Sequence, residues 1–135
     1  MDIVDRVIDL NRQSFPAGDE YNSAALLRGG VESGQLIVLT VPRRPIKNTI
    51  LSAYIVLKLD RRVIRVERVA VAPHDRNAGI GREIIERAIK WRDRNRPGVP
   101  LWAYISADNT ASINAHVHAG FGIEVNGPDW VWVMG

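Results

Sequence analysis

A strand that ends at a proline and leads through a glycine-containing loop into an amphipathic helix constrains this fold more than any other feature. Residues 63–72 have the composition of a strand, and Pro73 ends it because proline has no N–H for a strand ladder. The loop that follows reads RNAGIG over residues 76–81. From Ile80 onward the apolar residues fall on one face of a helix and the charged residues on the other. This order presents the unpaired first N–H groups of a helix beside the end of a strand, which favours an anion.

The rest of the chain reads as one alternation of elements, without repeats or a long linker. Apolar spacing and capping residues predict helices over residues 2–13, from Asn22 or Ser23 to Glu32, from Ile80 to the Pro97-Gly98 pair, and over 108–120. Strands are predicted over residues 35–41, 49–59, 63–72, 101–106 and 130–134, and the first two of these are expected to form a hairpin. At 135 residues, the chain is expected to be one domain over residues 1–135.

Composition narrows the possible classes of function. The sequence contains no cysteine, which excludes thiol nucleophiles, disulfides and zinc-thiolate sites. The longest apolar run is about half a membrane span and the amino terminus lacks a signal-peptide pattern, so we expect a cytoplasmic protein without membrane contact. The net charge of +3 suggests an anionic ligand. The basic residues are not interleaved with aromatic residues, and the four tryptophans, Trp91, Trp102, Trp130 and Trp132, are expected mainly in the core, so no nucleic-acid partner is expected.

The glycine loop alone is compatible with more than one reading. A nucleotide P-loop requires Lys-Ser or Lys-Thr after its second glycine, whereas Arg82 and Glu83 follow here. A dinucleotide-binding loop requires a third glycine where Ile84 stands. A backbone anion pocket, to which Arg76 and Arg82 add charge, and a purely structural role for the glycines in tight packing both remain open at this point.

Two motifs in register favour the anion pocket. The run VAVAPHDRNAGIG resembles motif A of the GNAT superfamily of acyl-CoA N-acyltransferases, and the run NTASINAHVHAGF resembles the second half of that family's signature. The positions that match are Val71, Pro73, Arg76, Gly79 and Gly81 in the first motif, and Asn109, Ser112, Gly120 and Phe121 in the second. The resemblance covers roughly residues 35–125. In the family a strand usually precedes the first helix, whereas this sequence begins almost at the helix, so that edge strand is expected to be absent or supplied in another way.

The resemblance implies an α/β (α+β) fold with a central mixed, mostly antiparallel sheet, about four flanking helices and two splayed central strands. It implies a single N-acetyltransferase domain that uses acetyl-CoA as co-substrate, without a metal, and is a monomer or homodimer. The residues that it implies for cofactor binding are Val69, Ala70, Val71, Arg76, Asn77, Ala78, Gly79, Ile80, Gly81, Arg82, Asn109 and Ser112. Transfer to a primary amine is expected to be direct, within a ternary complex, with the amide of Val69 stabilising the oxyanion.

Three side chains are candidates for proton transfer. In many family members a tyrosine five residues before the Phe of the Gly-Phe pair is the acid, and His116 stands at that position here. The alternative is that His116 only fills space and the thiolate leaves unaided or with water. Tyr104 is a second candidate acid, although a strand tyrosine usually belongs to the core. Glu67, two residues before Val69, is the candidate base, and its alternative role is a salt bridge with Arg65 or Arg68.

Two other functions remain possible from the sequence. The first is a non-catalytic module that binds coenzyme A, which the missing tyrosine and the short amino terminus suggest. The second is a protein-interaction module whose contact is the hairpin tip PRRPIKN, with Arg43, Arg44 and Lys47. The resemblance implies that the first two helices and the NGPDW loop bind the acceptor, and their acidic and aromatic residues would suit a cationic amine or a peptide amino group.

Overall fold

The computed structural model describes residues 2–43, 50–76 and 78–135. Asn77, which is among the predicted cofactor ligands, and the hairpin-tip residues Arg44 and Lys47 lie outside the described residues. The α-helices are α1 (Ile3–Ser14), α2 (Ala24–Ser33), α3 (Ile80–Asn95) and α4 (Thr110–His118), with short 3-10 helices η1 (Glu20–Asn22) and η2 (Pro73–Asp75). The strands are β1 (Leu36–Pro42), β2 (Leu51–Leu59), β3 (Ile64–Val71), β4 (Leu101–Ser106), β5 (Gly122–Asn126) and β6 (Trp130–Met134).

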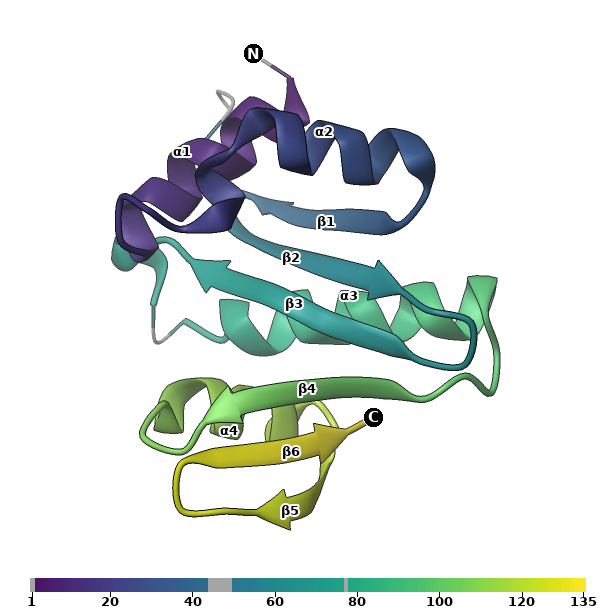
Figure 1. Cartoon of the computed structure of the whole chain (residues 1–135). Helices are drawn as coiled ribbons and strands as arrows, with labels where there is room; N and C mark the ends of the chain where they lie inside the picture. Colours follow the sequence, from purple (N-terminus) through teal and green to yellow (C-terminus); the bar gives the residue numbers. More distant parts are fainter. Residues whose placement is uncertain (1, 44–49, 77) are drawn as a thin grey trace.

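The strands form one mixed sheet in the order β1-β2-β3-β4-β6-β5 (Figure 1). Every neighbouring pair is antiparallel except β3 and β4, which run parallel. In the chain these two strands are connected through α3. This confirms the predicted α/β class with a mixed, mostly antiparallel sheet and four α-helices. In this sheet β1 is an edge strand, and it follows α1 and α2 in the chain.

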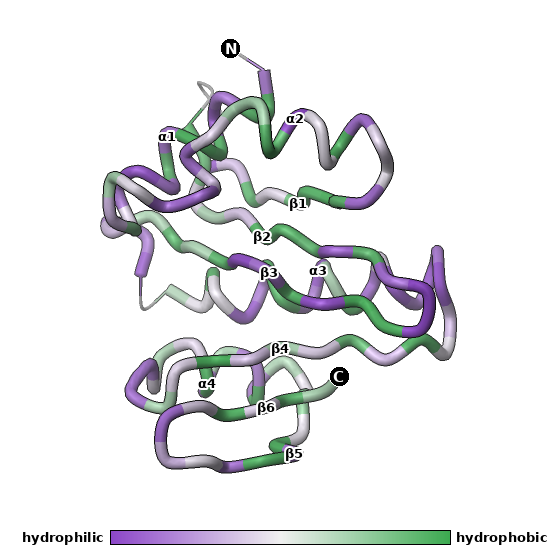
Figure 2. The backbone as a smooth tube through the Cα atoms, in the orientation of Figure 1, coloured by the Kyte–Doolittle hydropathy of each residue, from purple (hydrophilic) through white to green (hydrophobic). Residues whose placement is uncertain are grey.

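Two apolar clusters lie on opposite faces of the sheet. One packs α1 and α2 over β1 to β3, with Val7, Leu27 and Tyr54 fully buried. The other packs α3 and α4 against the opposite face, with Ile55, Ile84 and Leu101 among its buried residues. Because β2 is covered on both faces, it is apolar along most of its length, whereas β3 carries hydrophilic residues in its first half (Figure 2). No described helix combines the length and the apolar character that a membrane span requires.

The helices cover the two halves of the sheet unequally. On the α1 and α2 side, the cluster includes residues of β1, β2 and β3 but none of β4, β5 or β6 (Figure 1). Trp102 and Tyr104 of β4 point to this side, because their neighbours Leu101, Ala103 and Ile105 belong to the opposite cluster. This face of β4, β6 and β5 therefore carries no helix among the described residues.

The sheet opens between β3 and β4. The two strands pair only at Ile64 with Leu101, Arg65 with Trp102 and Val66 with Ala103. Immediately after the last of these pairs, the register of β3 against β2 shifts, so that Val56 pairs with Arg68 while Leu57 pairs with Val66. Glu67 is thus the extra residue of a β-bulge, a device that bends a strand and ends regular pairing. The predicted splay of the central strands is confirmed, and the bulge marks where it begins.

One strand was not predicted from the sequence. β5 (Gly122–Asn126) forms the second edge of the sheet, and all five of its residues are exposed. Its short stretch of alternating Ile123 and Val125 lacks the buried pattern from which the other strands could be predicted. The remaining predicted elements are present, with their ends shifted by one or two residues.

Candidate active site

A cleft of about 870 Å³ lies where β3 and β4 separate. Its walls come from the end of α1, the second half of β3, the amino-terminal turn of α3, β4, α4 and Trp130 of β6. Of the predicted cofactor residues, Val69, Ala70, Val71, Arg76, Gly79, Gly81, Arg82, Asn109 and Ser112 line it. The three predicted catalytic residues, Glu67, Tyr104 and His116, line the same cleft. The structure therefore brings together side chains that are up to about fifty residues apart in the sequence.

The amino terminus of α3 forms one end of the cleft. Gly79 is its N-cap residue, in the left-handed conformation with φ +77°, and no side chain caps this helix. By contrast, Asp2, Ser23 and Asn109 each accept a backbone N–H at the start of α1, α2 and α4. A Cβ atom at Gly79 would meet nothing within 4 Å. The first amides of α3 are therefore left without a side-chain acceptor beside open space, which suits an external anion.

The two glycines of the loop serve different purposes. A Cβ atom at Gly81 would lie 3.4 Å from Cβ of Ala115 and 3.8 Å from Cγ2 of Val71. These are ordinary van der Waals distances, so a methyl group would just fit at Gly81 and a larger side chain would press on α4 and β3. Gly79 provides a positive φ angle and an open backbone, which are the features that an anion pocket needs. The two glycines thus differ in what a side chain would meet at each position.

The two arginines beside the loop are positioned by weak local contacts. Nε of Arg76 donates to the carbonyl oxygen of Val71 at 3.3 Å, which directs this side chain along the open edge of β3. Nε of Arg82 pairs with Glu86 at 2.5 Å, and the Arg82 side chain is 60% exposed. Because neither guanidinium is buried, both can turn toward a phosphate at little energetic cost.

The other predicted cofactor residues divide into lining and supporting positions. Val69 and Val71 face the α3 side and Ala70 the α1 side, so β3 resumes its alternation after the bulge. Oδ1 of Asn109 accepts from the backbone N–H of Ser112 at 3.2 Å and caps α4. Two predicted residues do not line the cleft: Ala78 is exposed, and Ile80 packs against the core below α3. The amide of Ile80 still belongs to the uncapped first turn.

Glu67 lies at the bulge, and its position differs from the one inferred by alternation. Val66 and Val69 both pack against the α3 cluster although they are three residues apart, so Glu67 cannot be placed by counting back from Val69. As the residue after Val66, it points to the opposite face, as Arg68 does. There, burial raises the pKa of Tyr21 to about 12, and the negative charge of Glu67 adds to the rise. No described residue forms an ion pair with Glu67, including its predicted partners Arg65 and Arg68.

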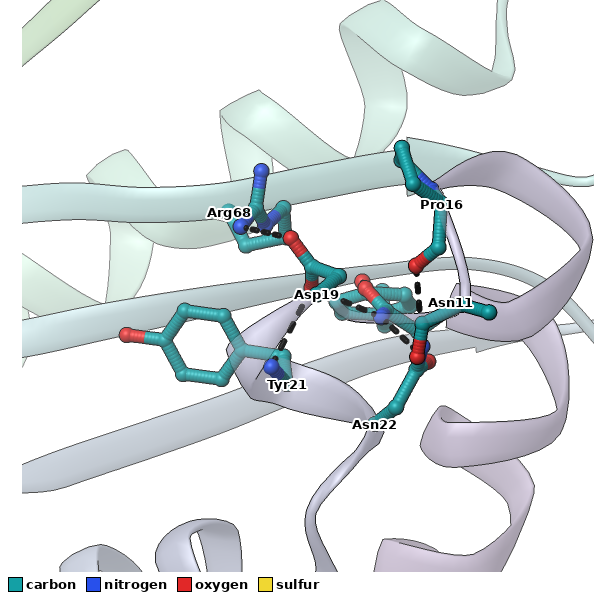
Figure 3. Close-up of polar contacts among 8 residues, drawn as sticks. Asn11, Pro16, Asp19, Tyr21, Asn22 and Arg68 are labelled. Atoms are coloured by element: carbon teal, nitrogen blue, oxygen red, sulfur yellow. Dashed lines mark hydrogen bonds and ion pairs between the residues drawn. The ribbon is translucent and has the colours of Figure 1, made fainter.

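Arg68 instead belongs to a polar network that the sequence did not reveal. Its guanidinium donates to Oδ1 of Asp19 at 2.6 Å (Figure 3). The guanidinium carbon also lies 4.2 Å from the ring centre of Phe15. Oδ2 of Asp19 accepts from Asn11 Nδ2 at 2.9 Å and from the backbone N–H of Tyr21 at 3.1 Å. This network fixes the segment between α1 and η1 against the bulge, so that Phe15 forms a wall of the cleft.

Tyr104 lies on the other side of the splay from Glu67. It follows Ala103, the last residue of β4 that pairs with β3, and points to the face without a helix. Its ring stacks on Trp130, with centroids 4.7 Å apart and an interplanar angle of 14°, and contacts Trp132 at 4.6 Å. Tyr104 is 46% exposed and Trp130 is 45% exposed, so the alternative core position considered for Tyr104 is not observed, and Trp130 is an exception among the tryptophans expected mainly in the core.

His116 is almost completely buried and is unsuited to donating a proton. Its Nδ1 donates to the carbonyl oxygen of Ser112 at 2.7 Å, which leaves Nε2 as an unprotonated atom. Nε2 is buried without a hydrogen-bond partner among the described residues. Burial lowers the pKa of the ring, more than the contact with Ser112 raises it. The ring is therefore neutral near pH 7, which argues against the acid role considered for His116 and for a packing role against Phe121, whose ring centre lies 5.0 Å away.

The described residues contain no group of three or more His, Asp or Glu side chains that could hold a metal ion. Negative charge in the cleft is also sparse, because Glu67 is the one acidic residue among the described residues that line it. The basic lining residues are Arg68, Arg76 and Arg82. The described part of the cleft thus has positive charge and an uncapped helix terminus at the α3 end, which suit an anionic ligand, and a single carboxylate at the other.

Comparison with known proteins agrees with this geometry. The sequence matches the profile of the acetyltransferase (GNAT) family over residues 6–121. No curated protein matches the sequence. Among solved structures, the ribosomal-protein-S5-alanine acetyltransferase of Vibrio fischeri has 12% sequence identity and a TM-score of 0.76, over 98% of this chain and 86% of that one.

Two further structures share the fold. The PaiA N-acetyltransferase of Thermoplasma acidophilum, in complex with coenzyme A, has 16% identity and a TM-score of 0.77, over 97% of this chain and 91% of that one. A spermidine N-acetyltransferase chimera from Vibrio cholerae and hSSAT has 14% identity and a TM-score of 0.73, over 97% and 87%. At such identities the likeness establishes the fold and leaves the acceptor open.

Proposed function

Because this chain belongs to the acetyltransferase (GNAT) family, we propose that it transfers the acetyl group of acetyl-CoA to a primary amine by direct attack in a ternary complex. The observation that carries the proposal is a single cleft with two different ends. An uncapped helix terminus with an open glycine lies at one end, and Glu67 and Tyr104 flank the splay at the other. An anionic cofactor and a cationic acceptor would meet between them.

The residues of this chain fit acetyl-CoA. The uncapped amides of Ile80, Gly81 and Arg82, together with Arg76, would hold the pyrophosphate. The edge of β3 beyond Val66 is not paired with β4, so its backbone is available to the pantetheine arm. Acetyl-CoA supplies an activated acyl group, and the chain supplies binding and orientation.

The reaction then needs a proton acceptor for the amine. An ammonium ion must lose one proton before its nitrogen can attack the thioester carbonyl, and a second proton leaves as the C–N bond forms and the C–S bond breaks. One of these protons returns to the coenzyme A thiolate, and one is released to water. Glu67 is the proposed acceptor, directly or through a water, because it is the acidic residue of the cleft and forms no ion pair with a described residue.

His116 is poorly placed to act as the acid. His116 holds its proton on Nδ1, against the Ser112 carbonyl, and burial opposes a second proton on Nε2. We therefore assign His116 to packing and expect the thiolate, a good leaving group, to depart unaided or with water. Tyr104 remains a candidate donor, because its ring lies beside the splay and is half exposed.

The cofactor assignment is tested by thermal shift with acetyl-CoA on three variants. Gly79→Asp introduces a negative charge at the proposed pyrophosphate site and should abolish the rise in Tm that acetyl-CoA produces in the parent protein. Gly79→Asn has nearly the same shape without the charge and should retain most of the rise.

Gly34→Asp is the matched control for backbone strain. Gly34 has φ +78° and, like Gly79, meets nothing within 4 Å at its Cβ position, but it lies at the end of α2 and does not line the cleft. The Gly34→Asp variant should therefore bind acetyl-CoA as the parent protein does. An unchanged acetyl-CoA response in Gly79→Asp would show that the loop does not hold the cofactor.

A non-catalytic module that binds coenzyme A is the second candidate, and the buried, neutral His116 at the usual acid position favours it. This candidate predicts an acetyl-CoA thermal shift without release of free thiol over a broad panel of amines. Thiol release with any amine, abolished in Glu67→Gln, would exclude it.

A further inference from the structure

The acceptor end of the cleft has an aromatic wall, formed by Tyr104 and Trp130. Their rings stack at 4.7 Å, and each is close to half exposed although both are large and largely apolar. Trp132 contacts Tyr104 from the neighbouring strand and supports the pair. The wall is part of the cleft that contains the glycine loop, so a ligand of that cleft is the natural occupant of this surface.

A single carboxylate among the described residues lines the same cleft as this wall. Val66 and Ala103 are the last pair between β3 and β4, and both point to the α3 side. The next residues, Glu67 and Tyr104, therefore both point to the opposite face, one on each strand where β3 and β4 begin to separate. The carboxylate and the phenol ring thus lie on the two sides of the mouth of the splay.

The other charges limit what an acceptor can carry. A second ammonium group would find no second carboxylate, because Glu67 is the one acidic residue that lines the described cleft. A carboxylate next to the amine would lie close to Glu67. It would gain little from Arg68, whose charge is already neutralised by Asp19 at 2.6 Å and whose plane lies over Phe15.

Resting on the proposed function, we propose that the acceptor is a small arylalkylamine, a primary amine joined by a short alkyl chain to an aromatic ring. The ammonium would lie at Glu67, and the ring would stack on the Tyr104–Trp130 wall across the mouth of the splay. Such a ligand carries one positive charge and no negative charge, which matches one carboxylate and a neutralised guanidinium.

The test measures kcat/KM by thiol release with four amines that differ from one another by one feature. They are 2-phenylethylamine, butylamine without the ring, 1,4-diaminobutane with a second ammonium, and phenylalanine with an added carboxylate. We expect 2-phenylethylamine to exceed each of the others by about tenfold or more. Equal or better turnover of 1,4-diaminobutane or phenylalanine would overturn the proposal.

A peptide arm decides between a small amine and a protein acceptor. An amidated tripeptide that begins with phenylalanine offers the same amine and ring on a peptide chain. If it is acetylated tenfold faster than 2-phenylethylamine, the recognised acceptor is a peptide and the proposal is wrong. Slower or equal acetylation supports the small arylalkylamine.

Two tryptophan variants locate the binding surface. Trp130→Ala should raise KM for 2-phenylethylamine by about tenfold, with little change in KM for butylamine or acetyl-CoA. Trp102→Ala is the matched control, because Trp102 lies on the same face of the sheet and contacts Trp132 at 5.0 Å but does not line the cleft. Equal effects of the two variants would contradict a role of the wall in acceptor binding.

The two levels of the assignment fail in different ways. If acetyl-CoA gives no thermal shift and no amine releases thiol, the acetyltransferase function itself is wrong. If acetyl-CoA binds but 2-phenylethylamine is not acetylated, or is not preferred, the proposed acceptor class is wrong. Thiol release with the other amines then decides whether the protein is an acetyltransferase.

Discussion

Replacing Asn11 with alanine tests how much the buried network beside the bulge contributes to the stability of the fold. Asn11 is fully buried, donates to Asp19 at 2.9 Å and to Asn22 at 2.8 Å, and accepts the hydroxyl of Tyr54. Asn11→Ala removes all three hydrogen bonds at once (Figure 3). The Tyr54 hydroxyl, which is fully buried, would be left without this acceptor.

The expected loss is large for one side chain. An orphaned buried hydroxyl costs about 1–3 kcal/mol, and the lost hydrogen bonds to Asp19 and Asn22 cost about 1 kcal/mol each. Together these give a decrease of about 3–5 kcal/mol in the free energy of unfolding, or about 10–20 °C in Tm for a chain of this size. Urea denaturation measures the free energy, and differential scanning calorimetry measures Tm.

Two further variants make the result specific. Asn95→Ala is the same chemical change at an exposed position, where the side chain contacts only the carbonyl of Trp91, and it should cost less than about 0.5 kcal/mol. In the double variant Asn11→Ala/Tyr54→Phe, the shared hydrogen bond is removed once, so the total loss should be at least about 1 kcal/mol smaller than the sum of the single variants. Additive losses, or a loss below about 1 kcal/mol in Asn11→Ala, would refute the reasoning.

Three other predictions concern the cleft. Glu67→Gln should lower kcat by about a hundredfold, since it removes the proposed base, while the acetyl-CoA thermal shift stays unchanged; a kcat within a factor of three of the parent would argue against that role. The buried, neutral His116 should make the parent protein less stable as pH falls from about 6.5 through the lowered pKa of its ring, because the unfolded chain binds a proton there that the folded chain does not bind. The urea midpoint of His116→Gln should depend less on pH over that range. An identical pH dependence in the two proteins would contradict the argument. An ideal Cβ atom at Gly81 would lie 3.4 Å from Cβ of Ala115, so the methyl groups of Gly81→Val would press on Ala115 and should cost about 1–3 kcal/mol in the free energy of unfolding. Gly79→Asn should cost less. Equal losses would show that close packing is not what distinguishes the two glycines.

The sequence predicted the elements that have a strong periodic pattern. Helix α3 begins at Ile80 as predicted, because its apolar stripe, charged face and glycine start agree with one another. β5 was missed because an exposed edge strand of five residues has no buried face to give it a pattern. The order of elements and the two motifs also predicted the open gap between β3 and β4, which depends on the family resemblance more than on any single residue.

The site was predicted in its backbone and less well in its side chains. The glycine loop could be recognised locally, because the positive φ angle and the helix start are properties of neighbouring residues. The surroundings of Glu67 could not, because a bulge is set by the packing of Val66 and Val69 on one core and leaves no mark in the sequence. The network of Asn11, Asp19 and Arg68 joins positions up to 49 residues apart and is visible only in the fold.

The bulge explains how one cleft has two chemically different ends. Val66 ends the pairing with β4 and Val69 faces the same core, so the extra residue between them turns Glu67 and Arg68 together to the α1 side. Arg68 then anchors the segment after α1 through Asp19, and Glu67 is left without an ion-pair partner among the described residues. On the α3 side, the same separation leaves the edge of β3 open beside the uncapped helix terminus.

This arrangement also bears on the two alternatives to catalysis. A surface used only for protein contact would need neither an uncapped helix terminus nor an unpaired carboxylate inside a cleft, and the hairpin tip proposed for that role lies largely outside the described residues. A module that only binds coenzyme A would account for the glycine loop but not for Glu67 and the exposed rings of Tyr104 and Trp130 at the opposite end. A carboxylate without an ion pair among the described residues and two half-exposed aromatic rings line the same cleft, so their presence together favours a second ligand there.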